Sequence, residues 1–92
     1  MIRFSELPKI FRVFPQGPMV LRGRLPGDEI SLSGGTKSVK KLFIDRKIPA
    51  AQRLRVPIVA DSGGILGICG IGADVRRRGQ TPVRIEFVAL GP

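Results

Sequence analysis

Residues 19–25 show the clearest alternation in the chain, because small or apolar side chains alternate with two arginines. A period of two residues is typical of a strand with one face exposed to solvent. Pro26 and Gly27 follow, and this pair suits the two central positions of a type II turn, since proline presets φ and glycine accepts a positive φ. The pattern therefore predicts a strand, a turn and a return strand over residues 29–33.

Residues 38–47 follow a helical period instead. At about 100° per residue, Val39, Leu42 and Phe43 share one arc of a helix. The opposite arc, around Ile44, is cationic and holds Lys37, Lys40, Lys41 and Lys47. This pattern predicts an amphipathic helix that packs its apolar side on the core.

Residues 33–38 read Ser-Gly-Gly-Thr-Lys-Ser. They superficially match the Ser-Gly-Gly-x-Asp-Ser loop of the PP-loop ATP pyrophosphatases, but Lys37 stands where that loop has aspartate. The spacing also differs from the Gly-x-x-x-x-Gly-Lys-Ser/Thr loop of Walker A sites. These differences favour a glycine turn that leads into the helix over an ATP site.

Prolines and glycines divide the rest of the chain into short elements. Pro49 ends the main helix and suits the start of a short second helix over residues 50–55. Strands are predicted over residues 57–60, 65–71 and 82–90, the second of them buried on both faces.

The predicted fold is therefore α+β. About five to seven short, mostly antiparallel strands accompany one main helix at about 38–47 and a short helix at about 50–55. Residues 19–92 are expected to form the domain. Residues 1–18 are an N-terminal segment without a clear period, which is either a linker or an edge strand.

The net charge of +9 at pH 7 points to a polyanionic partner, either nucleic acid or an anionic membrane surface. The membrane interpretation is weaker, because the longest apolar run, residues 65–73, contains three glycines and is shorter than the roughly 20 residues of a spanning helix. The first residues also lack a secretory pattern. We therefore expect a cytoplasmic protein with no membrane partner.

The single cysteine and the absence of histidine exclude several kinds of chemistry. A closed zinc site needs four nitrogen or sulfur ligands, and a cysteine nucleophile normally needs a histidine or an equivalent base. A disulfide within the chain is impossible with one cysteine. We therefore predict no catalytic residue, no metal site, and a buried, inert Cys69.

Seven of the sixteen Lys and Arg residues lie between Gly34 and Pro57, against one acid, Asp45. Lys37, Lys40 and Lys41 also fall near the positive N-terminal end of the predicted helix dipole, where each cation costs some tenths of a kcal/mol. A plain solvated surface is one interpretation of such a helix. Because the lysines are placed unfavourably for stability, we prefer a second interpretation, in which they bind an anion.

The candidate contacts to nucleic acid are all basic side chains. They are Lys37, Lys40, Lys41, Arg46, Lys47, Arg53, Arg55, Arg76, Arg77 and Arg78. Two alternatives stay open at this point. Arg53 can instead bond a main-chain carbonyl or Asp45, and the triple arginine can be an ordinary solvated loop.

Several stretches together resemble the C-terminal domain of bacterial tRNA(Ile)-lysidine synthetase. They are Gly35-Thr-Lys37, Leu42-Phe-Ile-Asp-Arg-Lys-Ile-Pro49 and Arg53-Leu-Arg-Val-Pro57, followed by a strand, a turn and a strand that ends at Gly70. The resemblance covers roughly residues 21–74. It departs from the family pattern at Gly67 and Cys69, where tryptophan and proline are expected.

The resemblance implies a β-rich fold, similar to a domain of phenylalanyl-tRNA synthetase, that grips tRNA near its acceptor stem. The parent enzyme is an ATP-dependent ligase. It uses ATP and lysine to convert the wobble cytidine of the isoleucine tRNA with a CAU anticodon into lysidine. That chemistry belongs to an N-terminal PP-loop domain, so the present chain is expected to be non-catalytic and to bind no cofactor itself.

The expected partners are therefore tRNA and the catalytic domain of the same enzyme, with a homodimer left open. Lys37, Lys40, Lys41 and Arg53 match the family motif, while the other candidates rest on charge alone. Two different interpretations remain. The chain can be a self-standing basic RNA-binding module, such as a small ribosome-associated protein, or a purely structural or dimerisation domain.

Overall fold

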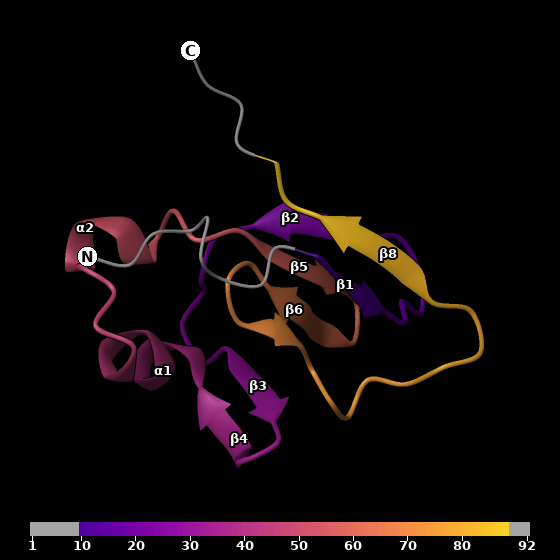
Figure 1. Ribbon diagram of the computed structural model, residues 1–92, viewed down its shortest axis with the longest axis horizontal. Coiled ribbons are helices and arrows are strands. Elements are labelled where there is room, and N and C mark those ends of the chain that lie inside the picture. The colour runs from indigo at the N-terminus through magenta and orange to yellow at the C-terminus, as the bar shows by residue number, and fades with distance from the viewer. Residues whose placement is uncertain (1–9, 89–92) are drawn as a thin grey trace.

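The computed structural model describes residues 10–88, and these form eight strands and two helices (Figure 1). The strands are β1 (Ile10–Val13), β2 (Val20–Arg22), β3 (Glu29–Leu32), β4 (Gly35–Ser38), β5 (Ile58–Asp61), β6 (Gly64–Ile68), β7 (Gly72–Ala73) and β8 (Val83–Glu86). The helices are α1 (Val39–Asp45) and α2 (Ala50–Arg53). The predicted class, a small β-rich α+β domain, is confirmed. Expectations for residues 1–9 and 89–92 lie outside the described residues.

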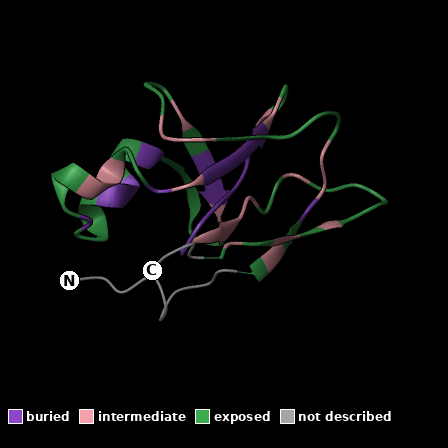
Figure 2. Cartoon of the chain, turned by 90° about the horizontal axis from the view of Figure 1, so that it is seen from above, coloured by how far each residue is buried: buried purple, intermediate pink, exposed green. Residues whose placement is uncertain are grey.

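The central sheet has the order β2-β5-β6-β7 and is covered on both faces. On one face, α1 and β3 pack against Ile58 and Ile68, which are fully buried. On the other face, the two-stranded β1–β8 sheet packs against Val59 and Leu66. The prediction that residues 65–71 form a very apolar, fully buried strand is confirmed for β6, and Cys69 directly after it is also buried. Figure 2 shows the buried residues along these central strands and on part of α1.

The predicted turn after β2 is present, but the predicted strand pairing is wrong. Gly27 has φ 85°, and Asp28 N–H donates to Leu25 C=O at 3.2 Å. However, β2 pairs with β5, whereas β3 pairs with β4 in a separate hairpin. The reason is burial, because β3 must place Ile30, which is 1% exposed, in the core beneath α1.

The glycine stretch forms this hairpin rather than a turn that leads directly into the helix. Gly35 takes φ 110° at the start of β4, a conformation that favours glycine. Four residues of β4 then pair with β3 before the helix begins, with Thr36 opposite Ser31. Lys37 therefore lies on β4 and not on the helix, which corrects its predicted place.

Both helices are shorter than predicted. Helix α1 ends at Asp45 because Lys47 adopts a left-handed conformation, with φ 57°. Lys47 N–H donates to Ile44 C=O and Ile48 N–H donates to Phe43 C=O, at 2.9 and 3.0 Å, which is the pattern of a Schellman motif. Helix α2 ends at Arg53 instead of residue 55, since the chain must bury Val56 and a proline follows it.

The N-terminal part of the described chain contributes to the core between the central sheet and the β1–β8 sheet. Within the segment expected to be a linker or an edge strand, residues 10–13 form β1 and pair with β8. The ring of Phe11 lies over Gly67, so close that a Cβ added there would be 2.3 Å from ring atom Cε1. Gly67 thus leaves room for an aromatic ring supplied by β1. On β8 the predicted alternation is confirmed, with Arg84 and Glu86 exposed.

Candidate nucleic-acid interface

Helix α1 separates an apolar side from a cationic side, as predicted. Val39, Leu42 and Phe43 are at most 3% exposed and belong to the core between α1 and the central sheet. Lys40 and Lys41 lie on the outer surface. The helix therefore presents its lysines to solvent because its apolar residues hold the other side against the sheet.

Two hydrogen bonds fix the start of α1. Val39 N–H donates to the main-chain carbonyl of Asp28 at 2.9 Å, which ties the helix to the turn after β2. The Ser38 hydroxyl caps the helix by accepting from Lys41 N–H at 3.1 Å. No acidic residue lies in the first turn. The two lysines thus stand at the positive end of the helix without a neutralising partner there.

The turn after α1 extends the cationic surface. Arg46 caps the helix, and the left-handed Lys47 follows it, so that both side chains are exposed. Within residues 10–88 no ion pair engages the basic side chains of α1 or of this turn. We call Lys37, Lys40, Lys41, Arg46 and Lys47 the helix cluster.

Arg53 and Arg55 lie beyond the helix cluster, on α2 and just after it. The Arg53 side chain is half-buried, and its Nε donates to Ile48 C=O at 2.9 Å. This is the carbonyl bond that the sequence left open as an alternative to RNA contact. Arg55 is exposed. Of the two, Arg55 is the more accessible to a large anion.

The triple arginine forms a loop between β7 and β8, as predicted, but its members differ. Arg77 Nη2 donates to both carboxylate oxygens of Asp61 at 2.8 and 2.7 Å, and Nη1 donates to Gly64 C=O at 3.2 Å. The Asp61 side chain is fully buried, and it also accepts from the main-chain N–H groups of Gln16 and Gly63. Arg77 therefore attaches the loop to the β5–β6 turn.

The Asp61 carboxylate is held ionised by its surroundings. Burial alone would raise the pKa of Asp61, but the hydrogen bonds from Arg77, Gln16 and Gly63, together with the charge of Arg77, outweigh burial and lower that pKa. A similar balance lowers the pKa of Asp28, whose burial is outweighed by bonds from the Arg22 guanidinium and Leu25 N–H. These two carboxylates serve the fold.

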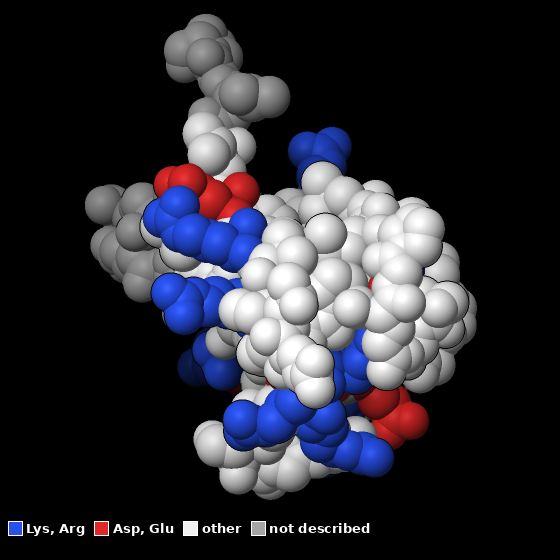
Figure 3. All heavy atoms as spheres, turned by 90° about the vertical axis from the view of Figure 1, so that its right-hand side faces the viewer, with Lys and Arg blue, Asp and Glu red and all other residues white. Residues whose placement is uncertain are grey.

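Arg76 and Arg78 remain exposed on either side of Arg77. In Figure 1 their loop lies at the right of the molecule, whereas α1 lies at the left. Figure 3 views the right-hand side and shows Lys and Arg gathered at its left and lower edges, with mostly uncharged surface between. Helix α1 with its lysines and the arginine loop thus lie on different sides of the molecule.

A family of known domains matches most of this chain. The family model described as the TilS substrate C-terminal domain matches residues 19–87. The chain belongs to this family. A solved structure described as the crystal structure of the TILS C-terminal domain superposes with a TM-score of 0.67 at 32% identity, and the match covers 97% of this chain and 78% of that one.

Curated relatives of this TilS C-terminal domain are much longer proteins. The tRNA(Ile)-lysidine synthase of Clostridioides difficile is 51% identical over 51 residues, which are 55% of this chain and 11% of the relative. The enzyme of the same name from Geobacillus kaustophilus is 42% identical over 80 residues, 79% of this chain and 17% of the relative. The chain therefore spans a small fraction of the relatives that it matches.

Two exposed cations within residues 10–88 of this TilS C-terminal domain were not among the predicted contacts. Arg12 on β1 and Arg84 on β8 are register partners and are both exposed. Arg84 lies 3.8 Å from the Glu86 carboxylate. No signal in the sequence indicated this pair, because β1 and β8 come from opposite ends of the chain.

None of the helices within residues 10–88 is long and apolar enough to cross a bilayer.

Proposed function

We propose that this TilS C-terminal domain binds tRNA through the helix cluster. The observation that supports the proposal most directly is the set of exposed cations without ion-pair partners within residues 10–88, two of them at the unfavourable end of α1. An anion at this surface would relieve their mutual repulsion. Arg55 extends the surface, and Arg53 contributes through guanidinium nitrogens other than Nε.

The recognition would be of RNA shape. The bases of an A-form stem lie in a deep, narrow groove that side chains cannot read, so proteins contact its phosphates and 2′-hydroxyls. The chain has no Trp or Tyr, and Phe43 of α1 is buried. The helix cluster offers point charges for phosphates and no exposed ring for stacking.

The relatives suggest which tRNA and which reaction. Because they carry the name tRNA(Ile)-lysidine synthase, we infer that this domain helps to position the isoleucine tRNA with a CAU anticodon, gripping it on the acceptor-stem side. A separate N-terminal PP-loop domain would perform the ATP-dependent conversion of the wobble cytidine to lysidine. This domain would then need no cofactor of its own and would work in the cytoplasm beside that catalytic domain.

The direct test is a titration of the 92-residue chain. The ligands are the isoleucine tRNA, its acceptor minihelix and its anticodon stem-loop, each at several salt concentrations. Neutralising about four to six phosphates gives a slope of log K against log salt of roughly −3 to −6. We expect tighter binding to the minihelix than to the stem-loop.

Two charge-matched variants locate the surface. Lys40→Gln/Lys41→Gln should weaken binding by about tenfold and reduce the salt slope by about two. Arg12→Gln/Arg84→Gln removes the same charge from the β1–β8 sheet and should change binding much less. Equal losses in the two variants would sink the proposal, because binding would then follow net charge alone.

A second candidate, a structural or dimerisation domain, has one observation in its favour. Val20 and Leu21 on β2 are 54% and 67% exposed, and within the described residues β2 pairs only with β5. An apolar strand with an unpaired edge favours contact with another protein surface. Sedimentation would distinguish a monomer from a dimer, since a dimer has twice the 10.0 kDa mass. Leu21→Lys should dissociate such a dimer.

A further inference from the structure

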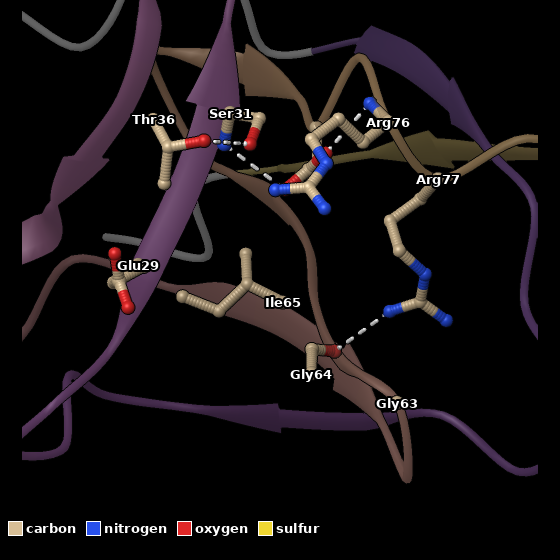
Figure 4. A pocket seen from close by; sticks show the side chains of 9 residues that line it. Glu29, Ser31, Thr36, Gly63, Gly64, Ile65, Arg76 and Arg77 are labelled. Carbon is tan, nitrogen blue, oxygen red and sulfur yellow. Dashed lines mark hydrogen bonds between the residues drawn. The ribbon is translucent and has the colours of Figure 1, made fainter.

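A polar hollow lies between the β3–β4 hairpin, the β5–β6 turn and the arginine loop. Its volume is about 360 Å³. The lining residues are Glu29, Ser31, Thr36, Gly63, Gly64, Ile65, Asp74, Arg76 and Arg77. Figure 4 shows Ile65 at its centre, with Glu29 on one side, Arg77 and Gly64 on the other, and the Arg76 guanidinium above.

The walls of this hollow are held firmly. Ser31 N–H and Arg76 N–H donate to the two carboxylate oxygens of Asp74 at 3.0 and 2.8 Å. The Ser31 and Thr36 hydroxyls form a hydrogen bond of 2.6 Å across the hairpin. Arg77 is bound to Gly64 C=O on the opposite side. The shape is therefore maintained without a ligand.

Two charged side chains in the hollow remain available. Within residues 10–88, no hydrogen bond or ion pair engages the carboxylate of Glu29 or the guanidinium of Arg76. They differ in this respect from Asp74 and Arg77, whose polar atoms serve the walls. The Glu29 carboxylate and the Arg76 guanidinium thus flank the same space without forming an ion pair with each other.

The floor of the hollow is apolar and unobstructed. Ile65 is 5% exposed and presents an aliphatic surface beneath the Arg76 guanidinium. At Gly64 an added Cβ would meet no atom within 4 Å, so open space continues over the turn. A hollow of about 360 Å³ with an aliphatic floor and a guanidinium group above it can hold one flat ring, and guanidinium groups are known to stack on nucleobases.

We propose that this hollow takes one unpaired nucleobase that carries an exocyclic amino group. The ring lies between Ile65 and the Arg76 guanidinium, and the Glu29 carboxylate accepts a hydrogen bond from the amino group, as acidic side chains do from cytosine N4. The inference rests on the proposed tRNA binding only in that the tRNA supplies the nucleotide.

The test uses nuclear magnetic resonance on the ¹⁵N-labelled 92-residue chain with four mononucleotide probes, AMP, CMP, GMP and UMP. The first three should shift the amide signals of Thr36, Gly64 and Ile65. UMP lacks the amino group and should bind about tenfold to 100-fold more weakly, as expected for one lost hydrogen bond to a charged group. Inorganic phosphate alone should leave these three amides in place.

Matched variants assign the contacts. Glu29→Ala should remove the preference over UMP, whereas Glu86→Ala, an exposed carboxylate on β8, should keep it. Arg76→Ala should weaken all four mononucleotides, and Arg78→Ala should not. The same shifts with inorganic phosphate, or equal binding of all four mononucleotides to the unaltered chain, would overturn the proposal.

The outcomes also separate this inference from tRNA binding by the helix cluster. Lys40→Gln/Lys41→Gln should leave the mononucleotide shifts unchanged while it weakens tRNA binding. If mononucleotides bind the hollow but that variant binds tRNA normally, only the helix-cluster proposal fails. If the variant loses tRNA binding but no mononucleotide shifts the three amides, only the nucleobase proposal fails.

Discussion

Lys40 on α1 has no anionic partner within residues 10–88, whereas Arg77 donates three hydrogen bonds, two of them to the buried carboxylate of Asp61. Both belong to basic stretches that look alike in the sequence. The lysine is held at the surface by its helix and leaves its charge unused, while the arginine uses its charge to attach a loop. A run of basic residues therefore contains both functional candidates and structural parts, and only their surroundings separate them.

The largest expected effect comes from removing the structural arginine. Arg77→Ala should lower the free energy of unfolding by about 3–5 kcal/mol, because it leaves the buried Asp61 carboxylate without its cation. Arg78→Ala, its exposed neighbour, should change stability by less than about 0.5 kcal/mol. Urea denaturation measures both. Equal effects in the two variants would contradict the structural role of Arg77.

A pH titration probes the same bond without a mutation. The pKa of Asp61 is lowered in the folded protein, as is that of Asp28, so their stabilising contribution is complete above the unfolded-state pKa of about 3.9. It is lost as the pH falls further, through the folded-state values. The free energy of unfolding should be constant near neutral pH and decrease below about pH 4. The decrease should be smaller in Arg77→Ala, because that variant lacks the guanidinium that lowers the pKa of Asp61. If the free energy of unfolding did not change with acid, Arg77 and Asp61 would not stabilise the fold as described. The contrast between the structural Arg77 and the unpaired helix cluster would then fail.

Replacing the left-handed residue after α1 should change the free energy of unfolding by a smaller amount and in the opposite direction. Lys47→Gly should raise the free energy of unfolding by about 0.5–1 kcal/mol, since glycine adopts φ near 57° without steric cost. Lys47→Ala removes the same charge and should give no such gain. Both variants should weaken RNA binding alike. If neither affects binding, Lys47 does not belong to the interface.

The smallest effect concerns the start of α1. Lys41→Glu should raise stability by about 0.3–1 kcal/mol, because an anion replaces a cation at the positive end of the helix dipole. The same change should weaken tRNA binding, with Lys41→Gln intermediate in both measurements. A loss of both stability and binding would indicate that Lys41 makes structural contacts and is not simply exposed.

The sequence was a good guide to elements and a poor one to their pairing. Periodicity located the apolar side of α1 and the alternation of β8, and the Pro26-Gly27 pair located the turn, since each depends on neighbouring residues. The partner of β2 was predicted wrongly, because β5 lies far along the chain. The role of Arg77 was also missed, since its partner Asp61 is 16 residues away.

The sequence by itself determined the β-rich class, the family resemblance and the candidate cationic residues, because composition, spacing and charge are local properties of the chain. Only the tertiary structure decided that Phe11 fills the space over Gly67, that α1 and the arginine loop lie on different sides of the molecule, and that Glu29 and Arg76 flank one hollow. The physical reason is that burial and long-range hydrogen bonds assign each charge its neighbours. Those neighbours determine whether a charge stabilises the fold or remains available to a ligand.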